Sequence, residues 1–240
     1  MRRHRRWGWV LLPLLLLLGL RWQGEHRRLQ ARMLGEMWLR QALQAEEQGI
    51  YRGEMVVNTL GTSGWETNHA LFLRARLVRF RYEYQQGPLR GKVAGCDGKR
   101  EWRYDPASNT LWTFPCLPAL PSQALGDLIL ENYIVEEGGQ EQWNSRPVRR
   151  LILRPRRPGA LWGRMLLDEE LRLPLLVERW SEKGELLSRT VCRFVEELSA
   201  EEVPEETFAP PKAAREERVA SPLPVEEGRL QDLQEELGFR

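Results

Sequence analysis

Residues 93–116 read VAGCDGKREWRYDPASNTLWTFPC, and this stretch decides the fold. Its apolar side chains recur at every second position, which is typical of β-strands because alternate residues of a pleated strand share a face. Asp97-Gly98 suits a tight hairpin turn, and Pro106 followed by Asn109 suits a second turn. The stretch therefore predicts a meander of three antiparallel strands.

Four aromatic residues of this meander lie on its second and third strands, namely Trp102, Tyr104, Trp112 and Phe114. An odd number of residues in the second turn places all four on one face of the sheet, whereas an even number divides them. Cross-strand aromatic pairs stabilise a sheet by roughly 0.2–1 kcal/mol each. We therefore expect the odd turn and a single aromatic face. These rings either line a binding site or form half of an ordinary hydrophobic core.

Two cysteines, Cys96 and Cys116, bracket the meander and fall at the same end of it. They lie two strands apart, which is about 9.6 Å and exceeds the ~7 Å limit between the Cα atoms of a disulfide. Pro115 immediately precedes Cys116, however, so the chain can fold back at this point. A Cys96–Cys116 disulfide therefore stays open, and Cys192 is left over.

The chain has 240 residues, of which 42% are hydrophobic and 29% charged, and it carries a formal charge of only +2. This composition fits one globular domain with appendages and excludes a polytopic membrane protein. Arginine outnumbers lysine heavily, but the arginines are spread along the chain without a nucleic-acid-binding pattern. We therefore expect no nucleic-acid partner.

The N-terminal segment 1–24 has a basic cluster followed by an apolar stretch over residues 7–20. This order is typical of an export signal. A helix over the apolar stretch spans about 21 Å, which is shorter than the ~30 Å hydrocarbon core of a bilayer. A signal anchor and a cleaved signal peptide both remain open. Either one predicts an extracytoplasmic location, with the membrane contacted through this segment.

The next segments alternate between helix and strand. Residues 25–48 predict an amphipathic helix whose apolar stripe contains Leu29, Met33, Met37 and Leu43, and residues 122–133 predict a second, short helix. Residues 65–84 predict one long strand in which the apolar phase changes at 77–78, which indicates a bulge or bend. Further strands are expected over residues 51–59, 133–137, 147–153, 161–168, 175–182 and 186–196.

These elements predict a mainly β protein with α (α+β), built on a strongly curved antiparallel sheet of roughly ten strands. The sheet forms an unclosed half-barrel, lidded by the N-terminal helix and the short central helix. The folded domain is expected over residues 25–211. Residues 212–240 are expected to form a charged linker and a short C-terminal helix over residues 227–237.

Motifs of common enzymes are missing from the sequence. It contains no phosphate-binding Gly-x-x-x-x-Gly-Lys loop, no dinucleotide fingerprint, no His-Glu-x-x-His and no Gly-x-Ser-x-Gly. His69 is the only histidine after residue 26, and no paired spacing of metal ligands accompanies it. We therefore predict a binding protein rather than an enzyme, with no catalytic residues, no metal and no cofactor.

Several stretches resemble those of the bacterial outer-membrane lipoprotein carrier (LolA-like) superfamily, and within it the N-terminal domain of the MucB/RseB sigma-E regulatory proteins. These stretches, which together cover about residues 40–211, are ALQAEEQGIYRGEMVV, CDGKREWRYDPASNTLWTFP, RPVRRLILRP, LLDEELRLPLLVERWSEKGELLSRTVCRFVEEL and VPEETFAPP. Each is a loose pattern of turns and alternation, so their order along the chain is more specific than any one of them.

The resemblance implies a curved sheet whose concave apolar face accepts acyl chains under the helices. It implies an envelope protein that binds lipid or lipoprotein acyl chains. The alternative that it implies is an envelope-stress signalling module that binds an anti-sigma factor or another membrane protein and carries no lipid. The residues expected to form the ligand-binding face are Trp102, Tyr104, Trp112, Phe114, Tyr82 and Tyr84.

Overall fold

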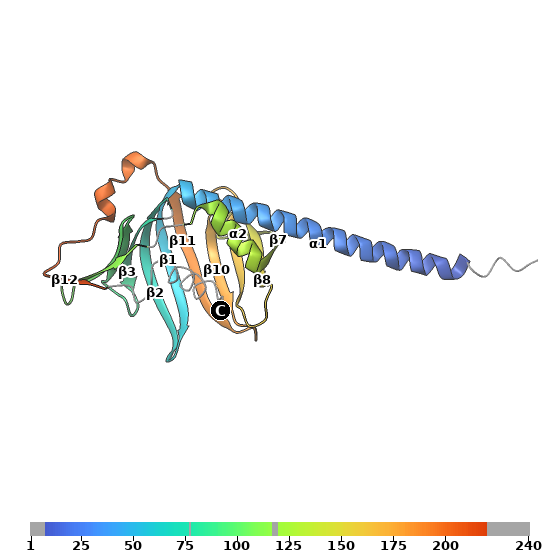
Figure 1. Cartoon of the computed structure of the whole chain (residues 1–240), viewed down its shortest axis with the longest axis horizontal. Helices are drawn as coiled ribbons and strands as arrows, with labels where there is room; N and C mark the ends of the chain where they lie inside the picture. The colour runs from blue at the N-terminus through green and yellow to red at the C-terminus, as the bar shows by residue number, and fades with distance from the viewer. Residues whose placement is uncertain (1–7, 77, 117–119, 220–240) are drawn as a thin grey trace, which may run out of the picture.

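The computed structural model describes residues 8–76, 78–116 and 120–219. These residues form one curved sheet with two α-helices packed against it (Figure 1). The helices are α1 (Gly8–Gln48) and α2 (Ser122–Asn132). Two short 3₁₀ helices, η1 (Ala200–Glu202) and η2 (Glu205–Phe208), follow the long strands.

The described part of the chain contains twelve strands, in the spatial order β12-β6-β5-β4-β3-β2-β1-β11-β10-β9-β8-β7. Their bounds are β1 (Ile50–Gly61), β2 (Gly64–Ala75), β3 (Arg79–Gln86), β4 (Val93–Asp97), β5 (Arg100–Asp105), β6 (Thr110–Pro115), β7 (Tyr133–Trp143), β8 (Arg146–Pro155), β9 (Trp162–Asp168), β10 (Pro174–Trp180), β11 (Leu186–Glu197) and β12 (Arg215–Arg218). Consecutive strands pair antiparallel from β1 to β6 and from β7 to β11, and β1 pairs antiparallel with β11 to join these two halves of the sheet.

The predicted fold class is confirmed, and two details of the strands differ from the prediction. The run over residues 65–84 is two strands, because Arg76 adopts a positive φ of 53° and the N–H of Val78 bonds to its carbonyl at 2.7 Å. The change of phase therefore marks a hairpin between β2 and β3 rather than a bulge. In addition, β12 pairs parallel with β6, whereas every predicted strand was antiparallel.

Helix α1 packs on the sheet through its C-terminal part and extends beyond the sheet at its N-terminal part (Figure 1). Gly35 lets the two backbones approach, since a Cβ at this position would lie 2.6 Å from the carbonyl oxygen of Val135. Trp38 and Leu39 are buried immediately after it. The described residues contain no helix that combines the length and apolar character needed to cross a membrane.

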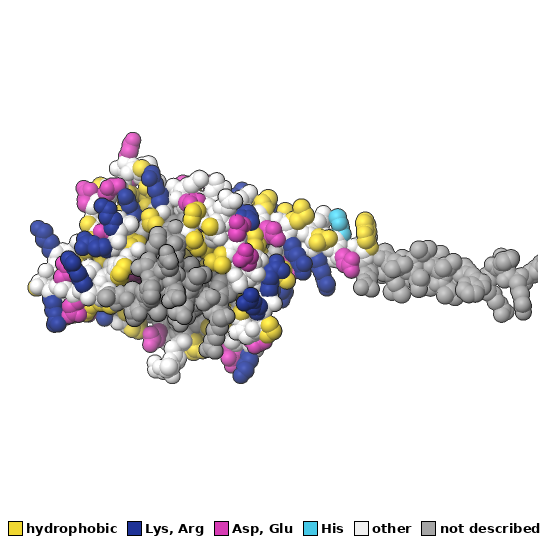
Figure 2. Space-filling view, viewed as in Figure 1, with side chains coloured by type: hydrophobic (Ala, Val, Ile, Leu, Met, Phe, Trp, Pro, Cys, Tyr) yellow, Lys and Arg dark blue, Asp and Glu magenta, His cyan; other side chains and the backbone are white. Residues whose placement is uncertain are grey.

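The predicted apolar stripe of α1 is not the stripe that packs. Leu29, Met33 and Met37 are 57%, 72% and 41% exposed, and Figure 2 shows hydrophobic side chains on this projecting part of the helix. The prediction was therefore wrong for these three residues and right for Leu43, which is buried. The side of α1 that packs is a second apolar stripe, Trp38, Leu39, Ala42 and Leu43, and Gly35 on the same side permits the close approach to β7.

The core has two clusters. One lies between the helices and β7–β9 and contains Trp38, Leu39, Ala42, Leu43, Ile129, Tyr133, Val135, Leu151 and Leu167. The other lies around β1, β2 and the β9–β10 connection and contains Tyr51, Phe72, Val148, Leu166, Leu173, Leu175, Leu176 and Val195. The predicted helix over residues 227–237 lies outside the described residues.

Candidate functional site

The inner face of the sheet is defined here as the face on which α1 and α2 pack. The pairing between strands shows which residues belong to this face, because directly paired residues of antiparallel strands point to the same side of the sheet. Phe72 pairs with Tyr82, Tyr82 with Ala94, Ala94 with Arg103, and Arg103 with Trp112. The inner face therefore continues from the buried core under α1 as far as β6.

An aromatic row lies on the inner face over β3 and β6, where it consists of Phe80, Tyr82, Tyr84, Trp112 and Phe114. All five side chains are half-buried. The rings of Phe80 and Tyr82 lie 5.2 Å apart, and the guanidinium of Arg103 lies 5.1 Å from the centre of the Phe114 ring. The Arg103–Glu101 ion pair of β5, at 3.5 Å, lies on the same face between the rings of β3 and those of β6, so the row is an aromatic surface interrupted by one charged pair.

Trp102 and Tyr104 lie on the opposite, outer face of the sheet, so the prediction of one face for all four meander rings was wrong. Trp102 pairs with Thr113, and Tyr104 pairs with Leu111. The cause is the length of the β5–β6 turn, which has the four residues 106–109 between the strand ends. An even turn shifts the pairing by one residue, and a shift of one residue moves a side chain to the other face.

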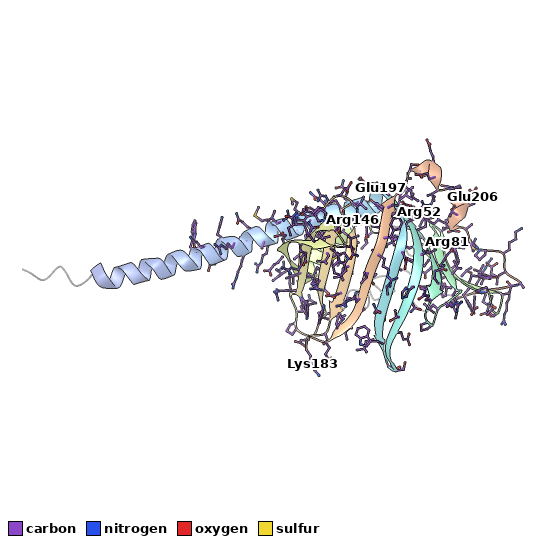
Figure 3. All side chains as sticks on the ribbon, turned by 180° about the vertical axis from the view of Figure 1, so that it is seen from behind. Arg52, Arg81, Arg146, Lys183, Glu197 and Glu206 are labelled. Atoms are coloured by element: carbon purple, nitrogen blue, oxygen red, sulfur yellow. The ribbon has the colours of Figure 1, made fainter. Side chains whose placement is uncertain are left out.

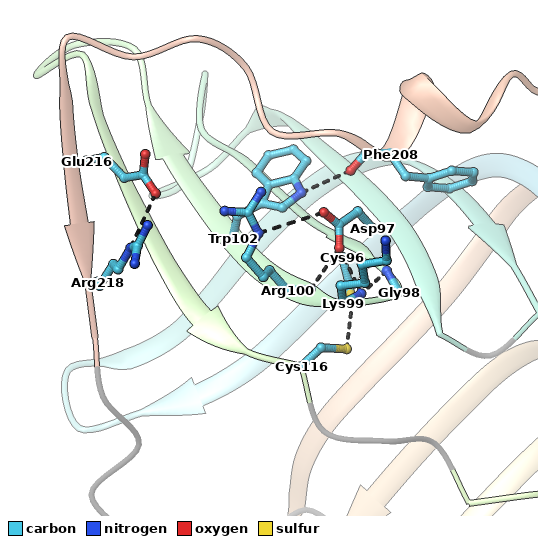
Figure 4. Close-up of polar contacts among 10 residues, drawn as sticks. All are labelled: Cys96, Asp97, Gly98, Lys99, Arg100, Trp102, Cys116, Phe208, Glu216 and Arg218. Carbon is cyan, nitrogen blue, oxygen red and sulfur yellow. Dashed lines mark hydrogen bonds and ion pairs between the residues drawn. The ribbon is translucent and has the colours of Figure 1, made fainter.

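Trp102 is fully buried on the outer face and belongs to the packing rather than to an open site (Figure 4). Its indole ring lies over Gly95, where a Cβ would come within 2.4 Å of the ring. Its Nε1–H donates to the carbonyl oxygen of Phe208 at 3.0 Å, and the guanidinium of Arg81 lies 5.8 Å from the ring centre. Trp102 therefore fastens the η2 segment to the sheet.

A small cavity of about 50 Å³ lies at the end of the inner face beneath the last turn of α1. Tyr51, Phe72 and Val195 supply apolar walls, and Cys192 opens onto the same space. Two further lining residues form an ion pair, since Arg74 Nη1 lies 3.6 Å from Glu46 Oε1. This pair joins β2 to α1 across the mouth of the cavity.

Burial and nearby charges shift the pKa of three groups at this cavity. Burial, followed by Glu197 and Glu46, raises the pKa of Tyr51 to about 12. Burial raises the pKa of the Cys192 thiol to about 11, with Arg74 opposing the shift and Glu46 adding to it. Tyr82 and Glu46 raise the pKa of Arg74, so it stays cationic. None of these groups is poised for acid–base chemistry near neutral pH.

Cys96 and Cys116 lie together, with their sulfur atoms 2.8 Å apart (Figure 4). Cys96 is buried at the end of β4, and Cys116 is the first residue beyond β6. The two-strand separation estimated from the sequence does not keep the thiols apart, because Cys116 lies just beyond the end of β6 and its sulfur reaches that of Cys96. Burial, followed by the hydrogen bond with Cys116, raises the pKa of the Cys96 thiol to about 12.

The described residues contain no group of three His, Cys, Asp or Glu side chains placed to hold a metal ion. His69 Nδ1 lies 4.0 Å from Glu54 Oε1, and both side chains belong to the outer face of β1 and β2. This pair lies apart from the aromatic row and the cavity, which belong to the inner face.

Sequence reasoning missed an arginine groove on the outer side of β8 and β9. The groove encloses about 670 Å³, and its charged lining consists of Arg150, Arg154, Arg156, Arg157, Arg164 and Glu182. Trp162 also lines it and stacks on Trp180 with ring centres 5.0 Å apart. The signal was present in the sequence as RRLILRPRRPG, in which strand alternation places Arg150 and Arg154 on one face and two more arginines follow the strand. Figure 3 shows the sheet from the side opposite to that of Figure 1.

Taken together, the fold and the inner face define a class of protein: a curved half-barrel with helices over one end of its inner face. No protein-family model and no curated protein matches the sequence. Solved structures do match. MucB matches with 21% identity and a TM-score of 0.53 over 75% of this chain and 63% of that chain.

Two further solved structures give similar values. The MucA/MucB complex of Pseudomonas aeruginosa matches with 20% identity and a TM-score of 0.52, over 74% of this chain and 61% of that chain. An uncharacterized conserved protein from Thermus thermophilus matches with 16% identity and a TM-score of 0.54, over 74% and 95% of the two chains. This chain therefore spans about three fifths of MucB. The predicted similarity of the fold to that of MucB is confirmed.

Proposed function

We propose that this protein is an extracytoplasmic binding protein that takes acyl chains of lipids or lipoproteins on the inner face of its sheet. The observation that carries the proposal is the aromatic row of β3 and β6. The described helices pack mainly on β7 and on each other, so the row continues the inner face beyond their cover (Figure 1). Half-buried aromatic side chains beside a packed apolar core are a suitable lining for an acyl chain.

An acyl chain on the aromatic row can extend toward the cavity beneath the last turn of α1, at the junction of α1 with β2. The cavity of about 50 Å³ is far smaller than the ~300–1,000 Å³ of typical ligand pockets. An acyl chain that entered from the aromatic row would therefore have to enlarge it. The Arg74–Glu46 ion pair is the described polar contact that such a movement would break. We expect acyl binding to separate the last turn of α1 from β2.

The experiment compares two tyrosines that lie on opposite faces. Tyr82→Ala removes a ring of the aromatic row, and Tyr104→Ala removes the same side chain from the outer face. With a fluorescent fatty acid as the probe, we expect Tyr82→Ala to weaken binding at least tenfold and Tyr104→Ala to leave it unchanged. Equal losses in both variants, or a wild-type protein that is free of lipid by native mass spectrometry and binds no probe, would count against the proposal.

A second candidate function is a signalling module that binds an anti-sigma factor or another membrane protein without lipid cargo. The observation that favours it is the dense packing under α1, where nine buried residues fill the space between the helices and β7–β9. MucB in complex with MucA shows that a protein of similar fold binds a protein partner. Recovery of a membrane protein in a pull-down that Tyr82→Ala leaves intact would support this function over acyl binding.

The proposed location rests on the N-terminal segment 1–24. Its basic and then apolar order supports export, with the segment kept as an anchor or removed by cleavage. Mass spectrometry of the N-terminus of protein purified from membrane and soluble fractions distinguishes the two. An intact Met1 in a cytoplasmic fraction would contradict the proposed location.

A further inference from the structure

Cys96 and Cys116 lie next to each other at the end of the meander formed by β4, β5 and β6. Their sulfur atoms are 2.8 Å apart, and a disulfide bond is about 2.05 Å long, so closure requires a movement of less than about 1 Å. The N–H of Gly98 also points at Cys96 Sγ at 3.4 Å and holds the β4–β5 turn against it. We infer that Cys96 and Cys116 close a disulfide in the folded protein when a thiol-oxidising disulfide donor is present.

The reaction balances as a thiol–disulfide exchange with the donor. Cys116, which is half-buried, attacks one sulfur of the donor disulfide and forms a mixed disulfide, and the donor releases a first thiolate. Cys96 then attacks Cys116 Sγ and displaces the second donor thiolate. Two S–H bonds are lost, one S–S bond forms, two protons leave and two electrons reduce the donor to two thiols. Cys96 is fully buried, so the donor cannot reach it directly, and it reacts second because its Sγ lies 2.8 Å from Cys116 Sγ.

The bond would fix the point at which the chain leaves the sheet. Cys116 follows β6, and the chain then continues toward α2. A Cys96–Cys116 bond encloses β5, β6 and both turns of the meander, and it ties this exit to the inner face of β4. The inference does not depend on the proposed acyl binding, because it rests on the geometry of the two thiols alone.

Cys192 serves as a matched control within the same chain. It lies on β11 at the cavity beneath α1 and belongs to the inner face there. Its position places it beside the second hydrophobic cluster, whereas the Cys96–Cys116 pair lies at the end of the meander. A disulfide that formed merely through exposure of thiols would not distinguish among the three cysteines.

The test uses the full chain equilibrated with oxidised glutathione, then denatured, alkylated and analysed by peptide mass spectrometry without reductant. We expect a 96–116 cross-linked peptide and alkylation of Cys192 only, with the same cross-link in Cys192→Ser. Three alkylated thiols in the wild type, or a cross-link that includes Cys192, would overturn the inference.

Thermal unfolding gives an independent reading. A bond that closes about 20 residues should raise the Tm by roughly 10 °C relative to the reduced protein. We expect this difference in the wild type and in Cys192→Ser, and none in Cys96→Ser or Cys116→Ser. A shift of equal size in Cys96→Ser would show that the oxidant acts elsewhere and would overturn the assignment.

Discussion

At the residue scale, Trp102 and Trp112 show how one strand pair serves two purposes. Trp102 is fully buried on the outer face and bonds to Phe208, whereas Trp112 is half-buried on the inner face, with its Nε1–H donating to Glu217 at 2.9 Å. Both are tryptophans ten positions apart in one meander. Their roles differ because the turn between them has four residues rather than three or five.

The first prediction compares these two indoles. Trp102→Phe keeps an aromatic ring over Gly95 but leaves the buried carbonyl of Phe208 without its donor, which should cost about 1–2 kcal/mol of unfolding free energy. Trp112→Phe, at the more exposed site, should cost less than about 1 kcal/mol. Urea unfolding followed by circular dichroism measures both. A larger loss at Trp112 would contradict the assignment of Trp102 to the structural core.

The second prediction concerns Cys192, whose pKa is raised from 9.0 to about 11 by burial. Arg74, Glu46 and Tyr51 face it across the cavity. A raised thiol pKa favours the neutral form in the folded state, so this contribution to stability is complete below pH 9 and is lost as the pH rises through 11.

Alkylation with iodoacetamide measures the same shift, because the thiolate is the reactive species. The rate at Cys192 in the folded protein should keep rising up to about pH 11, and in urea it should level off above about pH 9. Peptide mass spectrometry resolves Cys192 from the other two cysteines. A folded rate that levels off near pH 9 would show that the thiol is not held in a desolvating site.

At the scale of the elements, the contact of α1 with β7 depends on one glycine. A Cβ at Gly35 would lie 2.6 Å from the oxygen of Val135 and 2.9 Å from the nitrogen of Glu137. Both atoms belong to backbone, so the strand cannot yield by turning a side chain. The helix would have to move away from the sheet.

The third prediction follows from this contact. Gly35→Ala should destabilise the fold by about 1–3 kcal/mol and increase hydrogen exchange at the C-terminal end of α1. Gly24→Ala is the matched control in the same helix, since a Cβ there meets nothing within 4 Å, and it should stabilise by up to about 1 kcal/mol. Equal effects of the two substitutions would show that α1 does not depend on the close approach.

The same elements show what the sequence could predict and why it failed elsewhere. Helix and strand positions followed from periodicity, and α2 and the hairpin at Gly184 lie where they were expected. The facing of the aromatic residues was wrong because it depends on the exact residue count of a turn, and Pro106 and Asn109 fit turns of either parity.

Two other failures have the same kind of cause. The pairing of strands far apart in the sequence, such as β12 with β6, leaves no local pattern in a four-residue strand. The stripe of α1 was misassigned because the helix has a second apolar stripe with Trp38, Leu39 and Leu43, and periodicity alone does not show which of the two meets the sheet. Of the six residues proposed to bind a ligand, Tyr82, Tyr84, Trp112 and Phe114 share the inner face, whereas Trp102 and Tyr104 lie on the outer face.

At the scale of the whole molecule, the chain closes on itself in two places. The pairing of β1 with β11 joins halves of the sheet that are more than 100 residues apart, and it gives the sheet its unbroken order. The chain then leaves β11, crosses the outer face and pairs β12 with β6 at the far edge. Arg79 and Arg81 hold this crossing through Glu205 and the carbonyl of Thr207.

The crossing also protects an edge of the sheet. Without β12, the N–H and C=O groups of β6 on that side would be unpaired, and open edges favour association between copies. The N–H of Val219 donates to the carbonyl of Thr113 at 2.9 Å, so the chain pairs with β6 from β12 up to the last residues described. The segment 198–218 therefore acts both as a fastening and as an edge cover.

The fourth prediction tests this double role by removing residues 198–240. Truncation should lower the Tm by 10 °C or more, because it exposes the buried Trp102 and removes Phe208, and it should produce dimers or larger species on size-exclusion chromatography. Phe208→Ala keeps β12 and the carbonyl that accepts from Trp102 but removes the buried ring, so it should lower stability by about 3–5 kcal/mol while the protein stays monomeric. A truncated chain that is as stable and as monomeric as the full chain would show that the sheet depends neither on the contacts of Phe208 nor on the pairing of β12. Self-association in Phe208→Ala would show that the Phe208 ring, rather than β12, protects the edge of the sheet.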